Sequence, residues 1–392
     1  MPLDSQIHRM RSETPACKNL IHFNNAGCSL TPKPVLDSVI SHLCLEQEIG
    51  GYEAAAQADS QIERFYSALA GLLNCAAGEI AFIENATRAW DMAFYSIPFQ
   101  KGDRILTGQA EYASNYLAML QVQKLTGIEI TVIPSDEKGI LCLDRLQQEI
   151  TDRVKLIALT HIPSQSGIVQ PAQAVGEIAN KHNIIYLLDV CQSAGQMTLD
   201  VNKIGCDILT GTGRKYLRGP RGTGYLYIKN ELLDKLEPPF IDLHSASWKS
   251  EQEFEWQKNA RRFENWECFV AGKIGLARAV EYAMELGLEN IENRIQQLAR
   301  LLISALQAQK NITVFESGDC LSGIITFIKN DEKPLVLQQR LQPENINIGV
   351  SKRSSAMLDF SKRGLETINR ASLHYYNTEG EINKFIEVLS AK

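Results

Sequence analysis

The chain has 392 residues, of which 44% are hydrophobic, and a formal net charge of -6. Because this length exceeds one ordinary core, we expect two domains. The acidic balance and the lack of a long basic run argue against nucleic acid as a partner. The polar N-terminus lacks an apolar signal core, and no run of about 18 apolar residues occurs, so we expect a soluble cytoplasmic protein without membrane association.

The nine cysteines are scattered along the chain, odd in number and without a CxxC pair. This pattern predicts neither a disulfide framework nor a metal site. We expect most of them to be reduced and buried as small apolar side chains.

Strands and helices alternate through the first two thirds of the chain. Short apolar runs predict strands at 79–83, 104–107, 128–133, 156–160, 184–188 and 206–210. Helical patterns lie between them at 88–97, 113–125 and 172–182. The alternation predicts an α/β domain with a mostly parallel sheet.

The pattern changes after residue 262. Two helices are predicted at 268–286 and 288–309, then strands at 323–329 and 367–375 and a closing helix from Thr378. We therefore divide the chain into an N-terminal arm at 1–20, a large domain at 21–262 and a smaller α+β domain at 263–392. No repeat or flexible linker separates them.

An aspartate and a lysine follow two neighbouring strands of the predicted sheet. Asp189 ends the apolar run 184–188, and Lys215 follows the strand 206–210 and a short glycine-containing turn. Carboxyl ends of parallel strands share one edge, where such sheets bind ligands. A lysine can hold pyridoxal phosphate as a Schiff base, and a carboxylate can keep its ring nitrogen protonated. Taken singly, a helix-capping aspartate and a solvated lysine would be the simpler interpretation; together they predict a pyridoxal phosphate site in the large domain.

The residues around this pair carry a family resemblance. Asp189-Val190-Cys191-Gln192, Arg214-Lys215 and the segment 219–224 (GPRGTG) are similar to the class V aminotransferase family, from about Asn24 to the C-terminus. That family includes cysteine desulfurases, cysteine and cystine C–S lyases and isopenicillin N epimerase-like enzymes. The resemblance implies pyridoxal phosphate fold type I, a homodimer, a cofactor held by Lys215, Asp189 at the ring nitrogen and Gln192 at the ring hydroxyl.

The cofactor phosphate needs a cradle of hydrogen-bond donors. A strand runs into Asn85-Ala86-Thr87 at the start of a helical pattern, where free backbone N–H groups face an anion. An ordinary helix cap is the alternative. The resemblance places the phosphate at Ala86 and Thr87, with Thr212 and Arg214 beside it, although many desulfurases have histidine in place of Arg214.

The resemblance also assigns residues around the ring. Tyr112 would stack on the ring face; alternatively, it is a half-buried tyrosine at a helix start. Ser164 or Gln165 would approach the ring hydroxyl, where relatives have an asparagine in place of Ser164. His161 is expected to be a packed histidine at a strand end and not a base.

An amino-acid substrate needs an anchor for its carboxylate, which the planar arginine fork provides best. Arg370 is the candidate, on a strand that places it on one face with Ser372 and His374. Asn25 either borders the substrate or stabilises a glycine turn.

The segment Arg261-Arg262-Phe263-Glu264 resembles the one that reaches the partner subunit's phosphate. Here Trp266-Glu267 replaces the family's Gly-Thr, so the two arginines could instead form structural ion pairs. Trp266 either closes the substrate pocket or lies in a domain-hinge core.

Residues 349–368 contain no cysteine, whereas persulfide-forming desulfurases carry a nucleophilic cysteine on a mobile loop before the arginine strand. We therefore predict a lyase that eliminates the sulfur substituent of a cysteine-derived amino acid to give pyruvate and ammonia. Transamination and epimerisation remain alternatives from the same carbanion. A desulfurase and a noncatalytic scaffold rank lower, the latter because it needs no combination of Lys215, Asp189 and Arg370.

Overall fold

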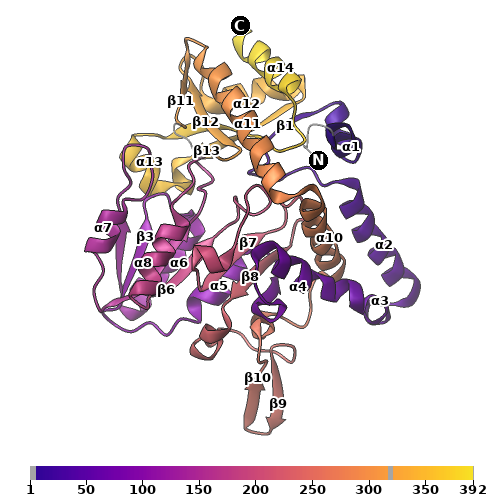
Figure 1. The fold of residues 1–392 in the computed structure, drawn as a ribbon, viewed down its shortest axis with the longest axis vertical. Coiled ribbons are helices and arrows are strands. Elements are labelled where there is room, and N and C mark those ends of the chain that lie inside the picture. The colour runs from indigo at the N-terminus through magenta and orange to yellow at the C-terminus, as the bar shows by residue number, and fades with distance from the viewer. Residues whose placement is uncertain (1–5, 317–320, 392) are drawn as a thin grey trace.

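The computed structural model describes residues 6–316 and 321–391. A seven-stranded sheet in the order β2-β8-β7-β6-β5-β3-β4 forms the larger part of the molecule (Figure 1). Its strands are β2 (Ile80–Ile83), β3 (Arg104–Gly108), β4 (Glu129–Ile133), β5 (Val154–Thr160), β6 (Ile185–Asp189), β7 (Ile208–Thr212) and β8 (Gly224–Ile228). Only β8 runs against its neighbours within this sheet, so the predicted mostly parallel sheet is confirmed.

Helices cover both faces of this sheet. Alternate residues of β6 enter opposite cores: Tyr186 and Leu188 belong to one, and Leu187 belongs to the other. A strand buried on both faces needs a continuous apolar run, which β6 has. The helices of this part are α2 (Lys33–Ile49), α3 (Gly51–Gln57), α4 (Asp59–Leu73), α5 (Ala86–Tyr95), α6 (Ala113–Thr126), α7 (Leu143–Gln148), α8 (Ala172–Lys181), α9 (Val201–Ile204) and α10 (Val270–Leu286).

A second, five-stranded sheet has the order β1-β13-β14-β12-β11. It consists of β1 (Ile21–Phe23), β11 (Ile312–Val314), β12 (Ile324–Lys329), β13 (Ile346–Lys352) and β14 (Thr367–Ser372), together with α11 (Leu288–Gln307), α12 (Pro334–Leu341), α13 (Met357–Arg363) and α14 (Glu379–Ser390). This is the predicted smaller α+β unit, at the top of Figure 1.

Two elements cross the predicted domain limits. Strand β1 pairs in parallel with β13 of the small sheet, although its residues were assigned to the large domain. Helix α10 packs against α2 and α4, although its residues were assigned to the small domain. The limits at residues 21, 262 and 263 stay a prediction.

Three predicted boundaries shift for local reasons. Helix α5 begins at Ala86 and not at residue 88, because the side chain of Asn85 accepts the N–H of Arg88 as a cap. Strand β7 continues to Thr212. Strand β14 ends at Ser372, so His374 does not lie on the strand as predicted; its N–H donates to the side chain of Asn377 in a turn.

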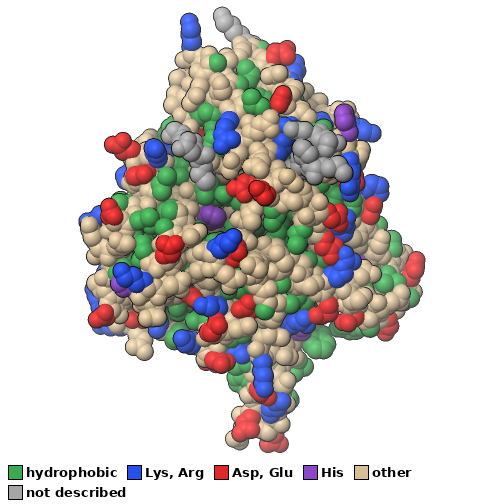
Figure 2. Space-filling view, viewed as in Figure 1, with side chains coloured by type: hydrophobic (Ala, Val, Ile, Leu, Met, Phe, Trp, Pro, Cys, Tyr) green, Lys and Arg blue, Asp and Glu red, His purple; other side chains and the backbone are tan. Residues whose placement is uncertain are grey.

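The remaining elements lie around these two sheets. The hairpin of β9 (Ala246–Ser250) and β10 (Glu253–Trp256) projects from the body at the bottom of Figure 1. The N-terminal arm holds α1 (Ile7–Ser12) and η2 (Pro15–Lys18), and further short helices are η3 (Ala77–Glu79), η4 (Asn230–Lys235), η5 (Ala260–Phe263), η6 (Gln342–Glu344) and η7 (Arg353–Ser355). Basic and acidic side chains are interspersed on the face shown in Figure 2. Within residues 6–316 and 321–391, no helix is long and apolar enough to cross a membrane.

Candidate active site

A cavity of about 200 Å³ opens where the strands of the large sheet end. All nine residues predicted to bind the cofactor line it: Ala86, Thr87, Tyr112, Ser164, Asp189, Gln192, Thr212, Arg214 and Lys215. Asn85, Asn115, Thr160, Ile162 and Cys191 complete the lining. The fold therefore brings together residues that lie far apart in the sequence.

Asp189 and Lys215 lie at one edge because β6 and β7 are parallel neighbours. Asp189 pairs in register with Thr210, and the chain reaches Lys215 just past the end of β7. Two donors fix the Asp189 carboxylate: the N–H of Cys191 lies 2.8 Å from Oδ1, and Nδ2 of Asn115 lies 3.1 Å from Oδ2. These bonds fix the orientation of the carboxylate that would face the ring nitrogen.

Lys215 is only 8% exposed, and its burial lowers the pKa of the amine below its usual value. A lowered pKa increases the fraction of neutral amine that can react with an aldehyde. Cys191 lies in the same cavity, but burial raises the pKa of its thiol well above the usual value, with the Asp189 charge adding to the effect. This thiol is therefore protonated and a poor nucleophile.

The N-terminus of α5 forms one end of the cavity. Asn85 caps the helix through Arg88, which leaves the N–H groups of Ala86 and Thr87 at the free helix end, where an anion is favoured. The start of this helix packs closely against strand β8 at Gly224, because a Cβ there would lie only 2.8 Å from the backbone carbon of Asn85. Thr212 and Arg214 line the same cavity and complete a donor-rich cradle.

Gln192 presents an unused acceptor to the cavity. Its Nε2 donates to the carbonyl oxygen of Ala26 over 3.0 Å, while Oε1 is buried and has no hydrogen-bond partner within the described residues. A buried polar atom without a partner is costly unless a ligand satisfies it. Tyr112 lines the cavity at the start of α6, and Gln165, the alternative to Ser164, instead donates to the carbonyl oxygen of Ala110 over 3.4 Å.

Arg370 lies behind this lining with its guanidinium held from two sides. Nη1 donates to the carbonyl oxygen of Ser164 over 2.8 Å, and Nη2 donates to Oδ1 of Asn24 over 3.2 Å. Its Nε is buried, and none of the described residues accepts from it. Arg370 is close enough to Lys215 for its charge to lower the pKa of that amine. A guanidinium with a free donor suits a carboxylate.

The structure does not bring Asn25 to the cavity. Its side chain is completely buried, where Nδ2 donates to the carbonyl oxygens of His22 and Ser372 and Oδ1 accepts the hydroxyl of Tyr376. Because every polar atom of this side chain is used within the protein, its placement argues against substrate contact and for the structural alternative. The neighbouring Asn24 holds Arg370 instead.

The sequence interpretation missed Asn115 and Glu111. Asn115, in the first turn of α6, lies four residues after Glu111 and donates to both Glu111 and Asp189. A carboxylate just before a predicted helix with an asparagine in its first turn was a usable signal. His161 was predicted to be a packed histidine, and this is confirmed: it is buried, its Nδ1 lies 3.0 Å from Ser193 Oγ, and burial lowers its pKa to about 4.

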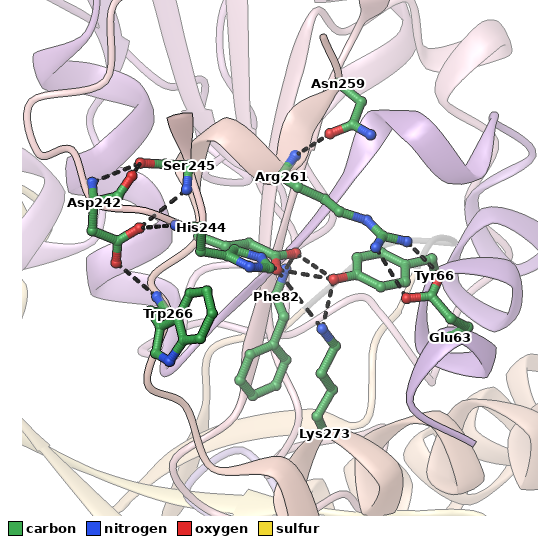
Figure 3. Close-up of polar contacts among 11 residues, drawn as sticks. Glu63, Tyr66, Phe82, Asp242, His244, Ser245, Asn259, Arg261, Trp266 and Lys273 are labelled. Carbon is green, nitrogen blue, oxygen red and sulfur yellow. Dashed lines mark hydrogen bonds and ion pairs between the residues drawn. The ribbon is translucent and has the colours of Figure 1, made fainter. Parts of the chain in front are cut away.

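The segment after β10 makes contacts within its own chain. Arg261 forms an ion pair with Glu63 and lies 3.8 Å from the centre of the Tyr66 ring (Figure 3). Arg262 donates to the carbonyl oxygens of Gln257 and Leu233. Both arginines therefore have partners within their own chain, which favours the structural alternative, while the contact with a partner subunit stays a prediction.

Glu264 and Trp266 occupy contrasting positions. The Glu264 carboxylate is buried and accepts the Phe82 N–H and the Tyr66 hydroxyl, with His244 Nε2 2.8 Å away (Figure 3). Trp266 is 59% exposed, so it is not a core tryptophan. It is also absent from the lining of the cofactor cavity.

Comparison with known proteins decides the family. The model of the family described as Aminotransferase class-V matches residues 21–385. The chain belongs to this family. A probable cysteine desulfurase from Xylella fastidiosa (strain 9a5c) is 30% identical over 99% of this chain and 96% of its own length. A probable cysteine desulfurase from Methanothermobacter thermautotrophicus is 27% identical over 97% and 96%.

Solved structures confirm the fold class. The apo structure of a cysteine desulfurase from Thermococcus onnurineus NA1 superposes with a TM-score of 0.92 at 26% identity, covering 97% of this chain and 96% of the other. A complex of the cystine C–S lyase C-DES with its reaction product cysteine persulfide has a TM-score of 0.87 at 23% identity, covering 96% and 98%. The second likeness concerns the fold alone. The chain is thus a fold type I enzyme.

The cavity fits the cofactor of this family, pyridoxal phosphate, as predicted. A buried lysine with a lowered pKa suits the aldehyde of the cofactor, and a fixed carboxylate suits its ring nitrogen. The free helix N-terminus suits the phosphate, and the unsatisfied Gln192 oxygen suits the ring hydroxyl.

Proposed function

We propose that this protein is a pyridoxal phosphate-dependent C–S lyase, which cleaves a cysteine-derived amino acid to pyruvate and ammonia. One observation carries the choice of elimination: residues 349–368, which run from within β13 into β14 just before Arg370, contain no cysteine. The end of β13, η7 and α13 occupy most of this segment. Elimination needs no protein thiol, whereas transfer of the sulfur to the enzyme as a protein-bound persulfide does.

The roles of the side chains follow from their positions. Lys215 would hold the cofactor and then move the α-proton, which its lowered pKa favours. Arg370 would bind the substrate carboxylate through Nε and orient the α-hydrogen. The bound cofactor supplies an electron sink for the carbanion, which Asp189 strengthens by keeping the ring nitrogen protonated. Tyr112 would stack on the ring and Ser164 would help to hold Arg370.

A cysteine desulfurase is the second candidate, because the relatives described above are named probable cysteine desulfurases. This is the reaction that the sequence interpretation ranked lower. Cys191 gives it little support, since its thiol pKa is raised. Cys320, the cysteine nearest in sequence before residues 349–368, lies outside the residues that the structure describes.

The two reactions differ in their products. Elimination from cysteine and water gives pyruvate, ammonia and hydrogen sulfide, whereas a desulfurase transfers the sulfur to a protein thiol and gives alanine. We expect the purified holoenzyme to release pyruvate from cysteine, cystine or a cysteine conjugate, with activity unchanged by Cys320→Ala. Alanine together with a trapped persulfide would establish the desulfurase instead. A keto acid formed with loss of the cofactor aldehyde, or a D-amino acid, would indicate an aminotransferase or an epimerase.

We also propose a homodimer located in the cytoplasm. The family resemblance supports the dimer, and the scattered cysteines without a disulfide pattern support the location. Sedimentation analysis of the purified holoenzyme tests the first: a single species of one-chain mass would contradict it.

A further inference from the structure

Glu316 is a buried carboxylate that the reaction described above does not use. It lies between β11 and β12 and is 2% exposed. Its Oε1 accepts the Thr326 hydroxyl over 2.6 Å and the Gly167 N–H over 3.2 Å. Its Oε2 accepts the Thr326 N–H over 2.6 Å. Burying a carboxylate is costly, so three converging donors point to a position where the structure needs this group.

Both hydrogen-bond partners of Glu316 belong to segments that lie next to Arg370. Thr326 on β12 lies opposite Arg370 in the antiparallel register with β14. Gly167 belongs to the loop of Ser164, whose carbonyl oxygen accepts Nη1 of Arg370 over 2.8 Å. Glu316 thus joins the strand next to Arg370 to the loop that holds its guanidinium.

The loop is pressed closely against β12. A Cβ at Gly167 would lie 1.9 Å from the carbonyl oxygen of Ile324, so only glycine fits there. An isolated bridge pairs Ile168 with Leu321 beside this contact. With the backbones this close, the Gly167 N–H is directed to the Glu316 carboxylate.

We propose that Glu316 is a positioning residue that sets the guanidinium of Arg370 for the α-carboxylate of the substrate. This inference rests on the role of Arg370 in the proposed function. A carboxylate suits the position because it only accepts hydrogen bonds, whereas an amide would place an NH₂ group against one of the three donors. It does not contact the substrate, and it acts through Thr326 and the Ser164 loop.

The test measures carboxylate binding without turnover. Glycine is titrated into the holoenzyme, and its Kd is read from the absorbance of the bound cofactor. Methylamine has the same amine without a carboxylate and serves as the matched probe. We expect Glu316→Gln to weaken glycine about tenfold and to leave methylamine unchanged, because a misplaced guanidinium affects only the carboxylate.

A second pair of variants keeps the test informative if Glu316→Gln fails to fold. Thr326→Val removes the hydroxyl that donates to Glu316 and keeps the shape of the side chain, whereas Thr326→Ser keeps the hydroxyl. We expect Thr326→Val to weaken glycine severalfold and Thr326→Ser to bind it normally. In an Arg370→Lys background, Glu316→Gln should add little further loss.

The outcomes separate the inference from the function on which it rests. If Arg370→Lys weakens glycine but Glu316→Gln and Thr326→Val do not, the positioning role is wrong and the proposed role of Arg370 stands. If glycine and methylamine weaken equally in Glu316→Gln, the residue is merely structural and the inference fails. If Arg370→Lys binds glycine normally, the carboxylate role of Arg370 fails, and the inference fails with it.

Discussion

Asn115 donates through one amide nitrogen to Glu111 and to Asp189, with Nδ2 lying 2.9 Å from Oε1 of the first and 3.1 Å from Oδ2 of the second. Glu111 is buried, and this burial, together with the Asp189 charge, raises the pKa of its carboxyl. The Thr160 hydroxyl donates to the same Glu111 oxygen. The orientation of Asp189 thus depends on a polar network in the wall of the cofactor cavity.

Replacing Asp189, or the Asn115 side chain that holds it, should slow turnover by different amounts. Asp189→Asn should retain the cofactor but lower kcat by about a hundredfold, since breaking a buried ion pair costs about 3 kcal/mol or more. Asn115→Ala should lower kcat by about tenfold, as expected for one hydrogen bond to a charged group. Steady-state assays with measured cofactor content check both values. Unchanged turnover in Asp189→Asn would remove its assigned role.

Lys215 should be the only residue that carries the cofactor covalently. Reduction of the holoenzyme with borohydride and peptide mapping should find the pyridoxyl group on Lys215, because its buried amine has a lowered pKa and lines the cavity. Lys273 is a matched control, since it is also a buried lysine but donates to the Tyr66 hydroxyl. Label on Lys273 or on any other lysine would contradict the site.

Arg218 should be essential for stability. It is 1% exposed and donates to the Thr14 hydroxyl, the Tyr375 hydroxyl and the carbonyl oxygen of Leu30. Arg218→Met should lower the free energy of unfolding by about 3 kcal/mol, because buried acceptors lose their donor. Urea unfolding at fixed protein concentration measures this. The exposed Arg300→Met should change it by less than about 0.5 kcal/mol; an equal loss in both variants would refute the argument.

His161 should make the protein sensitive to acid. Its pKa falls to about 4 in the folded state through burial, against about 6.5 in the unfolded state. The unfolded chain therefore binds the proton first, and stability is lost as the pH falls from about 6.5 towards 4, by up to about 3 kcal/mol. The pKa values of His22 and His374 are also lowered, so their effect has to be subtracted. The measured quantity is therefore the difference in the free energy of unfolding between wild type and His161→Asn across this pH range. A difference independent of pH would contradict the prediction.

The elements that the sequence predicted were those with an unbroken local signal. The strands of the parallel sheet were found from short apolar runs, and β6 is an example, since every residue from Tyr186 to Asp189 is buried. Strand β13 was missed although Ile346, Ile348 and Val350 alternate along it. The pairing of β1 with β13 had no local signal at all, because three residues carry no information about a distant partner.

The residues that motif spacing assigned to the cofactor line one cavity, because they follow strand ends. Asn24 reaches Arg370, while Asn25 turns into the core, as the structural alternative for Asn25 would have it. Neighbouring residues in a tight turn point in opposite directions, and a sequence without coordinates does not tell them apart. Glu316 lacked any motif, because its importance arises from contacts with Gly167 and Thr326.

The parallel pairing of Ile21 with Ile346 also bears on how the chain is made. During synthesis the strand Ile21–Phe23 leaves the ribosome early. Its partner β13, in the five-stranded sheet, is synthesised only near the end of translation. The nascent chain must therefore keep this strand unpaired while the large sheet forms, and closing so long a loop makes the step slow. Chaperone demand during translation should thus concentrate on the first strand of the protein.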